Sequence, residues 1–209
     1  MSQFDMFNPP PPQPKSLEEL IGEMMGMTND PLADAGTNVV ISRGNPKAKL
    51  LIIGEAPGPQ ENIQGKPFVG RAGQLLDKIL QAANFDPEND VYITNSVFRM
   101  PPGEDGKAFR KPTNEEIEYY HPYVLEIIRL VDPLIMLLTG NVACQSILGR
   151  TGITSLRGQW TQSKGRWIMP IFHPSYLLRN PSREPNAPKA LMWNDIREVR
   201  RKLDELLRK

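Results

Sequence analysis

Three side chains of the sequence could together bind a flat, polar ring. Phe68 lies in the tight loop Pro67–Gly70 and can offer an aromatic face. Asn95 ends the apolar segment VYITN, and its amide carries a donor and an acceptor, which can match the edge of a pyrimidine. His173, in FHPSYLLRNP, follows another apolar segment and precedes a proline turn. We therefore expect a site for a planar base, with the alternatives that Asn95 only forms a turn and that the histidine is structural.

The loop after the first apolar run favours a ring over a phosphate as the ligand. It begins Gly54-Glu55-Ala56 and contains neither the Gly-x-Gly-x-x-Gly dinucleotide fingerprint nor the Gly-Lys-Ser/Thr of a Walker loop. Glycine at positions 54 and 58 allows the backbone to pass close to a flat ligand. We expect this loop to contact the ring.

The segment after His173 carries groups that suit a nucleic acid. Ser175 and Arg179 can meet phosphates, and Leu177 or Leu178 can wedge between bases. The second histidine, His121, lies within a predicted helix and is expected to be structural.

The elements that must position these loops alternate along the chain. Apolar runs predict strands within 49–57, 91–98, 133–140 and 166–174. Helical patterns lie at about 70–84, 113–130, 141–149 and 189–208. We expect an α/β fold with three layers, α/β/α, around a central, mostly parallel four-stranded sheet. Ligands of such sheets bind beyond the carboxyl ends of the strands, where the loops 54–70, 95–103 and 173–180 should converge.

Length and composition fit one domain with a tail. The 209 residues divide into a disordered, Pro-rich tail of residues 1–15 and a domain of residues 16–209. No apolar stretch is long enough to span a membrane, and the start of the chain lacks the features of a signal peptide, so we expect a cytoplasmic protein. We also expect a monomer. The single Cys144 is expected to be a small buried hydrophobe.

Charge is divided unevenly along the chain. Residues 1–149 carry 12 Lys and Arg against 19 Asp and Glu, whereas residues 150–209 carry 13 against 5. A basic C-terminal third can attract a polyanion, and the alternative is a solvated basic helix at 189–209.

The loop segments resemble the motifs of a known family. GEAPG, GKPFVGRAG, NSVFRMPPG and HPSYLLRNP, in this order, are similar to motifs of the uracil-DNA glycosylase superfamily, most closely its bacterial and archaeal family 4, over about residues 36–206. The resemblance implies base excision repair: a hydrolase that cleaves the N-glycosidic bond of uracil in DNA. It also implies that Phe68 stacks on the flipped uracil, that Asn95 hydrogen-bonds its edge and that His173 faces its O2.

The chemistry of the residues agrees with this activity. A base inside a duplex must be extruded before an enzyme can act on it, and stacking and edge contacts offset part of that cost. Cleavage leaves negative charge on the uracil ring, so a neutral imidazole that donates to O2 stabilises the transition state. Glu61 is our candidate for orienting the attacking water, with a solvated loop carboxylate as the alternative, and Glu55 either contacts the substrate or braces the loop. A non-catalytic module that binds nucleic acid or a base is the alternative function.

One departure from the family concerns its iron–sulfur cluster. The resemblance implies a four-iron cluster on four cysteines, and alignment by eye places Met27, Asp30, Arg99 and Tyr120 at those positions. None of these side chains can replace a thiolate in such a cluster. We therefore expect no cluster, no metal and no cofactor.

The N-terminal tail contains a second candidate interaction. Gln3-Phe4-Asp5-Met6-Phe7 resembles the pentapeptide by which bacterial repair proteins bind the replicative sliding clamp. Met6 and Phe7 can fill an apolar pocket while Gln3 hydrogen-bonds at its rim, and the proline tract can act as a spacer. The alternative is a tail whose match is accidental.

Overall fold

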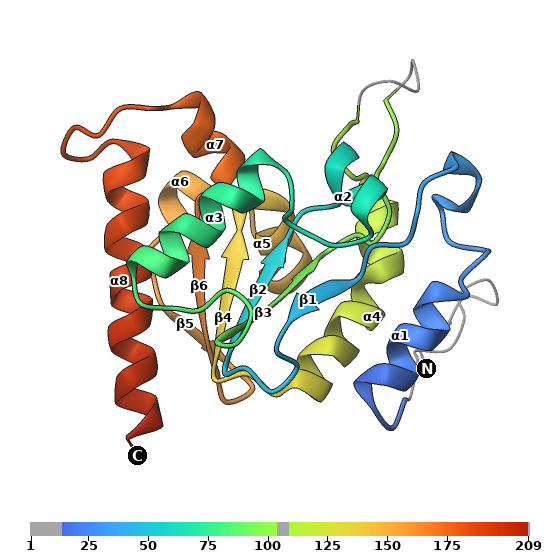
Figure 1. Cartoon of the computed structure of the whole chain (residues 1–209), viewed down its shortest axis with the longest axis horizontal. Helices are drawn as coiled ribbons and strands as arrows, with labels where there is room; N and C mark the ends of the chain where they lie inside the picture. Colours follow the sequence, from blue (N-terminus) through green and yellow to red (C-terminus); the bar gives the residue numbers. More distant parts are fainter. Residues whose placement is uncertain (1–13, 104–108, 209) are drawn as a thin grey trace.

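A six-stranded mixed sheet forms the centre of the computed structural model, which describes residues 14–103 and 109–208 (Figure 1). The strand order is β1-β3-β2-β4-β6-β5. The strands are β1 (Ser42–Gly44), β2 (Leu50–Gly54), β3 (Val91–Asn95), β4 (Ile135–Thr139), β5 (Thr161–Ser163) and β6 (Arg166–Ile171).

The four strands that the sequence predicts are the four inner strands, and all of them run parallel. β2 pairs with β3 on one side and with β4 on the other, and β4 pairs with β6. Every residue of β2, β3 and β4 is buried, which is why their sequences are continuously apolar rather than alternating. The predicted number of strands was too small, because β1 and β5 add a short antiparallel strand at each edge. Each edge strand has only three residues and no apolar pattern from which it could be predicted.

Helices cover both faces of the sheet and confirm the three-layer α/β/α prediction. The helical segments are α1 (Leu17–Met25), the 3₁₀ helix η1 (Ala33–Ala35), α2 (Pro59–Gln64), α3 (Arg71–Ala82), α4 (Asn114–Val131), α5 (Gly140–Leu148), α6 (Ile153–Leu156), α7 (Pro174–Arg179) and α8 (Pro188–Leu207). α1, α4 and α5 pack on one face together with Leu51 and Ile53 of β2. α3, α7 and α8 pack on the other face together with Leu50 and Ile52. Successive residues of a strand point to opposite faces, so β2 contributes to both cores.

The start of α4 shows how a local signal fixes an element. The Thr113 side chain accepts a hydrogen bond from the backbone N–H of Glu116, and the Glu116 side chain accepts one from the backbone N–H of Thr113. This capping box is the one that the sequence predicts, and Arg110 reinforces it with an ion pair to Glu116. Among the described helices, none is long and apolar enough to cross a membrane. The predicted tail, with Gln3, Met6 and Phe7, lies almost entirely outside the described residues.

Candidate active site

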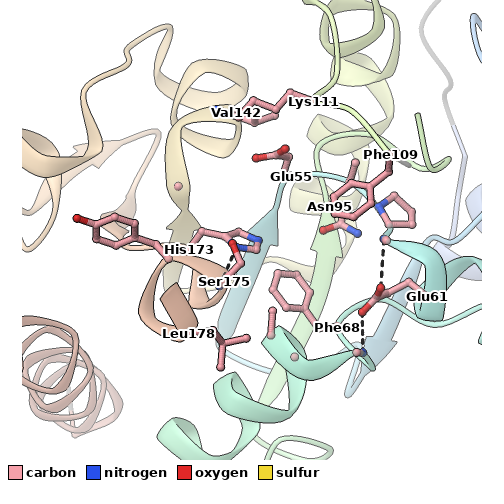
Figure 2. A pocket seen from close by; sticks show the side chains of 18 of the residues that line it. Glu55, Glu61, Phe68, Asn95, Phe109, Lys111, Val142, His173, Ser175 and Leu178 are labelled. Carbon is pink, nitrogen blue, oxygen red and sulfur yellow. Dashed lines mark hydrogen bonds between the residues drawn. The ribbon is translucent and has the colours of Figure 1, made fainter. Parts of the chain in front are cut away.

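A cavity of about 950 Å³ opens at the carboxyl end of the parallel strands (Figure 2). The loop after β2 lines it with Glu55 and Ala56, and β3 contributes Asn95. The loop after β6 contributes His173, and Phe68 lies between α2 and α3. The structure therefore brings together side chains from four segments that are up to 118 residues apart in the sequence, at the edge where parallel sheets bind their ligands.

Phe68 sits in this cavity with an unusual backbone conformation. Its φ is +55°, in the left-handed region that non-glycine residues adopt at a cost of about 1–3 kcal/mol and keep only when their surroundings hold them. The side chain is buried, and its ring centroid lies 5.9 Å from that of His173. A Cβ at Gly73 would lie 1.9 Å from the Phe68 carbonyl oxygen, so only glycine lets α3 approach this loop. The sequence segment GRAG contains this glycine, but nothing in the sequence alone shows its contact.

Glu61 fixes the other side of the same loop. One carboxylate oxygen accepts hydrogen bonds from the backbone N–H groups of Val69 and Gly70, at 2.9 and 2.8 Å. The second oxygen accepts one from the backbone N–H of Gly58, at 3.1 Å (Figure 2). Glu61 thus links the two loops that sequence reasoning singled out, and both of its oxygens are already occupied.

Asn95 is buried, and the donor of its side-chain amide is unpaired within the described part of the chain. Its side chain is 1% exposed, and its Nδ2 has no hydrogen-bond partner among the residues that the structure describes. A buried polar group without a partner is costly, and this one lies at a cavity where a ligand can pair with it. Gly54 leaves room for this arrangement, because a Cβ there would lie 2.3 Å from Asn95 Oδ1 and 2.5 Å from the Phe68 ring. Asn95 is therefore a fixed donor at the cavity wall.

His173 has its tautomer set by its neighbour. Nδ1 accepts a hydrogen bond from the backbone N–H of Ser175 at 3.2 Å and lies 2.8 Å from Ser175 Oγ. In the neutral ring the proton therefore sits on Nε2, which is left as a donor. Burial lowers the pKa of His173 to about 4, and the nearby charge of Arg179 acts in the same direction. The imidazole is thus neutral at physiological pH, and Gly140 packs against it, since a Cβ there would lie 3.1 Å from His173 Cβ.

Glu55 is the second carboxylate of the cavity, and it differs from Glu61. Its side chain accepts no hydrogen bond from the described part of the chain, and Figure 2 shows it between Lys111 and His173. Burial raises its pKa, while the positive charges of Lys111 and Arg179 counteract that increase. Its oxygens are available to a ligand or to water.

The mouth of the cavity carries apolar and basic side chains. Ser175, Leu178 and Arg179 line it, and Leu178 is partly exposed. Leu177, by contrast, is completely buried in the core, because α7 turns it away from solvent. Of the two leucines that the sequence offers as a wedge, only Leu178 is accessible from outside. Sequence reasoning missed two residues of the opposite rim, Phe109 and Lys111, since they lie beyond any apolar pattern.

His121 lies away from this cavity, in the middle of α4. It is partly buried, and burial lowers its pKa. Cys144 is fully buried in α5, where burial raises the pKa of its thiol to about 11. Both residues take the places that were expected of structural residues.

The four positions aligned with cluster cysteines do meet in space, but as a polar network. The Arg99 guanidinium pairs with the Asp30 carboxylate at 2.9 Å, and the Tyr120 hydroxyl donates to Asp30 Oδ1 at 2.5 Å. Arg99 also donates to the backbone carbonyl of Met27 at 2.9 Å and to that of Thr37. The Asp30 and Tyr120 side chains are buried.

This network does not fit an iron–sulfur cluster. The whole chain contains one cysteine, Cys144, and it lies in α5 rather than at any of these positions. A guanidinium and a phenol hydrogen-bonded to a carboxylate fill the space with mutually neutralised groups and supply no thiolate. The backbone and side-chain contacts connect the α1–η1 segment to the loop after β3 and to α4.

Comparisons with known proteins agree with this geometry. The model of the uracil DNA glycosylase superfamily matches residues 41–197. The Type-4 uracil-DNA glycosylase of Thermotoga maritima is 37% identical over 192 residues, which cover 89% of this chain and 94% of that protein. The Type-4 enzyme of Archaeoglobus fulgidus is 34% identical over 177 residues, covering 80% and 85%, and that of Sulfurisphaera tokodaii is 31% identical over 194 residues, covering 88% and 84%.

Proposed function

We propose that the cavity holds a uracil base extruded from DNA. The chain belongs to the uracil DNA glycosylase superfamily and is a uracil-DNA glycosylase, an enzyme that excises uracil from DNA. Phe68 supplies an aromatic face for stacking. The unpaired Nδ2 of Asn95 supplies a donor for the edge of uracil, and the neighbouring Oδ1 supplies an acceptor. That unpaired, buried amide is the observation that carries this assignment.

His173 acts on the charge that develops during cleavage. When the N-glycosidic bond breaks, the electron pair moves into the uracil ring and the sugar becomes electron-deficient. The Nε2–H of a neutral His173 is a fixed donor for O2, where part of this negative charge accumulates. A donor that is in place before the reaction stabilises the transition state more than the ground state.

We assign the two cavity carboxylates differently from the sequence expectation. Glu61 accepts three backbone hydrogen bonds, so it is suited to hold the loops around Phe68 rather than to orient water. The Glu55 carboxylate accepts none from the described residues and lines the same cavity. It is therefore our candidate for orienting the water that attacks the sugar.

The mouth of the cavity binds the DNA strand in this proposal. Leu178 is the apolar residue that enters the space left by the extruded base, and Ser175 and Arg179 contact phosphates. Lys111 adds a positive charge on the opposite rim. The basic character of residues 150–209 favours binding of the same polyanion.

We further propose that the enzyme works without an iron–sulfur cluster, because the network around Asp30 occupies the place of its ligands. Protein purified without oxygen should be colourless and contain no iron. Brown protein with about four iron atoms per chain would contradict this.

A separate proposal concerns the tail, whose Gln3, Met6 and Phe7 suit the sliding clamp of bacteria. Tethering through this peptide would raise the concentration of the enzyme at replicated DNA. Purified clamp should bind the wild-type protein and should not bind the variant with Gln3→Ala, Met6→Ala and Phe7→Ala. Equal binding by both proteins would reject the peptide.

The test of the activity is an end-labelled oligonucleotide with one uracil, incubated with the protein and then treated with alkali, which breaks abasic sites. We expect one shorter labelled fragment. The same oligonucleotide with thymine at that position, and the protein with His173→Ala, serve as controls. An intact uracil oligonucleotide after incubation with the wild-type protein would reject the function.

A further inference from the structure

Arg43 lies outside the cavity but is bound to the loop that carries Phe68. It belongs to the edge strand β1, and its side chain is only 7% exposed. Its Nε donates to the carbonyl oxygen of Pro67 at 3.0 Å, and Nη2 lies 3.4 Å from that of Phe68. Nη2 also pairs with Asp77 of α3 at 2.5 Å, and Nη1 pairs with Glu88 at 3.2 Å.

These contacts hold the backbone at Phe68, where its conformation is strained. Phe68 has a φ of +55°, and its ring lies against Gly54 and Asn95 of the cavity wall. Glu61 holds the N–H groups of Val69 and Gly70, just after Phe68. Arg43 holds the carbonyl oxygens of Pro67 and Phe68 from the other side. The loop is therefore fixed by one charged group at its N–H groups and by another at its C=O groups.

The geometry requires arginine rather than any positive charge. Two carbonyl oxygens and two carboxylates approach three different nitrogens of one planar guanidinium. A lysine ammonium in the same place has one nitrogen on a flexible stem, and it cannot reproduce this fork. The two carboxylates balance the charge of a guanidinium that is nearly buried.

We propose that Arg43 is a positioning residue for uracil excision, which acts by holding the Phe68 ring in the orientation that stacks on the base. The inference rests on the proposed function of the cavity. Arg43 does not line the cavity or its mouth and contacts Phe68 through the backbone carbonyl, so it should affect the reaction of bound DNA and not the binding of DNA. A misplacement of a substrate-positioning group by about 1 Å can lower a rate about 100-fold.

The test compares Arg43→Lys with the matched control Arg166→Lys. Arg166 also contacts one backbone carbonyl and one carboxylate, those of Lys164 and Asp132, but it begins β6 at the end opposite to the cavity. We expect Arg43→Lys to lower the single-turnover excision rate about 10- to 100-fold, at a temperature where the protein is folded, with unchanged affinity for DNA. Arg166→Lys should excise uracil at the wild-type rate.

A double-mutant cycle separates positioning from general damage. If Arg43 acts through the Phe68 ring, Arg43→Lys should have little further effect on the excision rate once Phe68→Ala is present. Full additivity of the two substitutions, or a wild-type rate for Arg43→Lys, would overturn the inference while leaving the function of the cavity intact.

Hydrogen exchange provides a readout that does not need activity. In Arg43→Lys we expect the amides of Val69 and Gly70 to exchange faster than in the wild-type protein, whereas in Arg166→Lys they should not change. If the wild-type protein leaves uracil in DNA, the proposed function fails, and this exchange still shows whether Arg43 holds the loop. Unchanged exchange at these two amides in Arg43→Lys would overturn the inference.

Discussion

Two buried polar regions lie at the two ends of one short segment, residues 95–99. They differ in the hydrogen bonding of their polar side chains. At its start, Asn95 has an unpaired Nδ2 in the cavity wall. At its end, Arg99 donates to Asp30 and to the carbonyl oxygens of Met27 and Thr37. Asn95 and the Asp30 partner of Arg99 are both buried, so burial alone does not separate a binding site from a structural one. Asn95 and Asp30 differ in that Asp30 is paired within the protein, whereas the Asn95 Nδ2 has no partner among the described residues.

Hydrogen bonds fix the backbone of the segment between the two regions. Ser96 donates to the carbonyl oxygen of Gly54 from both its backbone N–H and its hydroxyl, at 3.0 and 2.8 Å. The backbone N–H of Val97 donates to the carbonyl oxygen of Glu55, and the carbonyl oxygen of Phe98 accepts from the backbone N–H of Val40. We therefore expect the Asp30 network to govern stability and the cavity to govern chemistry, and the following substitutions test that division.

The largest effect on stability should come from Arg99→Met. It leaves the Asp30 carboxylate buried with only the Tyr120 hydroxyl and the Leu32 backbone N–H as partners within residues 14–103 and 109–208. Breaking a buried pair in this way costs about 3–5 kcal/mol of unfolding free energy, measured by urea denaturation. Arg201→Met removes an exposed partner of the partly exposed Glu198 and should change the unfolding free energy very little. A loss as small as that control in Arg99→Met would show that the network is not a structural unit.

His173→Ala should lower the excision rate strongly and the stability only slightly. Losing a fixed donor to a developing anion costs about 2.7–4 kcal/mol of transition-state stabilisation, which is about a 100- to 1,000-fold slower excision. The same substitution removes the acceptor of the Ser175 backbone N–H, a helix cap worth about 1 kcal/mol of stability. Single-turnover excision and urea denaturation measure the two effects. An excision rate near that of the wild-type protein would remove His173 from the mechanism.

Tyr120→Phe measures how much the Tyr120 hydroxyl contributes to the stability of the network. It removes one hydrogen bond to a charged group and keeps the edge-to-face contact with Phe98 at 5.5 Å. Because Arg99 still neutralises Asp30, we expect a loss of about 1.5 kcal/mol in unfolding free energy. A loss equal to that of Arg99→Met would mean that the hydroxyl, and not the ion pair, holds the region together.

The pH dependence of stability tests the neutral state of His173. The pKa of His173 is lowered from 6.5 to about 4 by burial, so the unfolded chain binds a proton at this site before the folded protein does. Unfolding free energy should therefore fall as the pH drops from about 6.5 towards 4. His121 acts in the same direction, so the informative quantity is the difference between the wild-type protein and His173→Asn. We expect a shallower decrease in the variant, and equal slopes would contradict a buried, neutral His173.

Much of the fold was predictable because the inner strands carry strong local signals. β2, β3 and β4 are buried on both faces, so their apolar runs are continuous, and the capping box marks the start of α4. The edge strands β1 and β5 were not predictable, since three partly exposed residues form no pattern. Their existence depends on the neighbouring strand, which only the folded chain supplies.

The site was predictable in its residues and less so in their contacts. Phe68, Asn95 and His173 follow from strand ends and motifs, and the structure brings them to one cavity. Leu177 and Leu178 differ only in which side of a six-residue helix they occupy, and the sequence did not decide between them. The contacts of Glu61 and Arg43 with backbone groups 8 to 25 residues away carry no local signature.

Asn95→Ala is the sharpest test of the role proposed for the unpaired amide, when the single-turnover excision rate and the unfolding free energy of the same protein are both measured. We expect excision slower than wild type by about 100-fold or more, because the variant lacks the donor and acceptor for the uracil edge. We also expect little loss of stability, because the deleted Nδ2 has no partner among the described residues. Excision at the wild-type rate would contradict the claim that this unpaired amide is kept for the base.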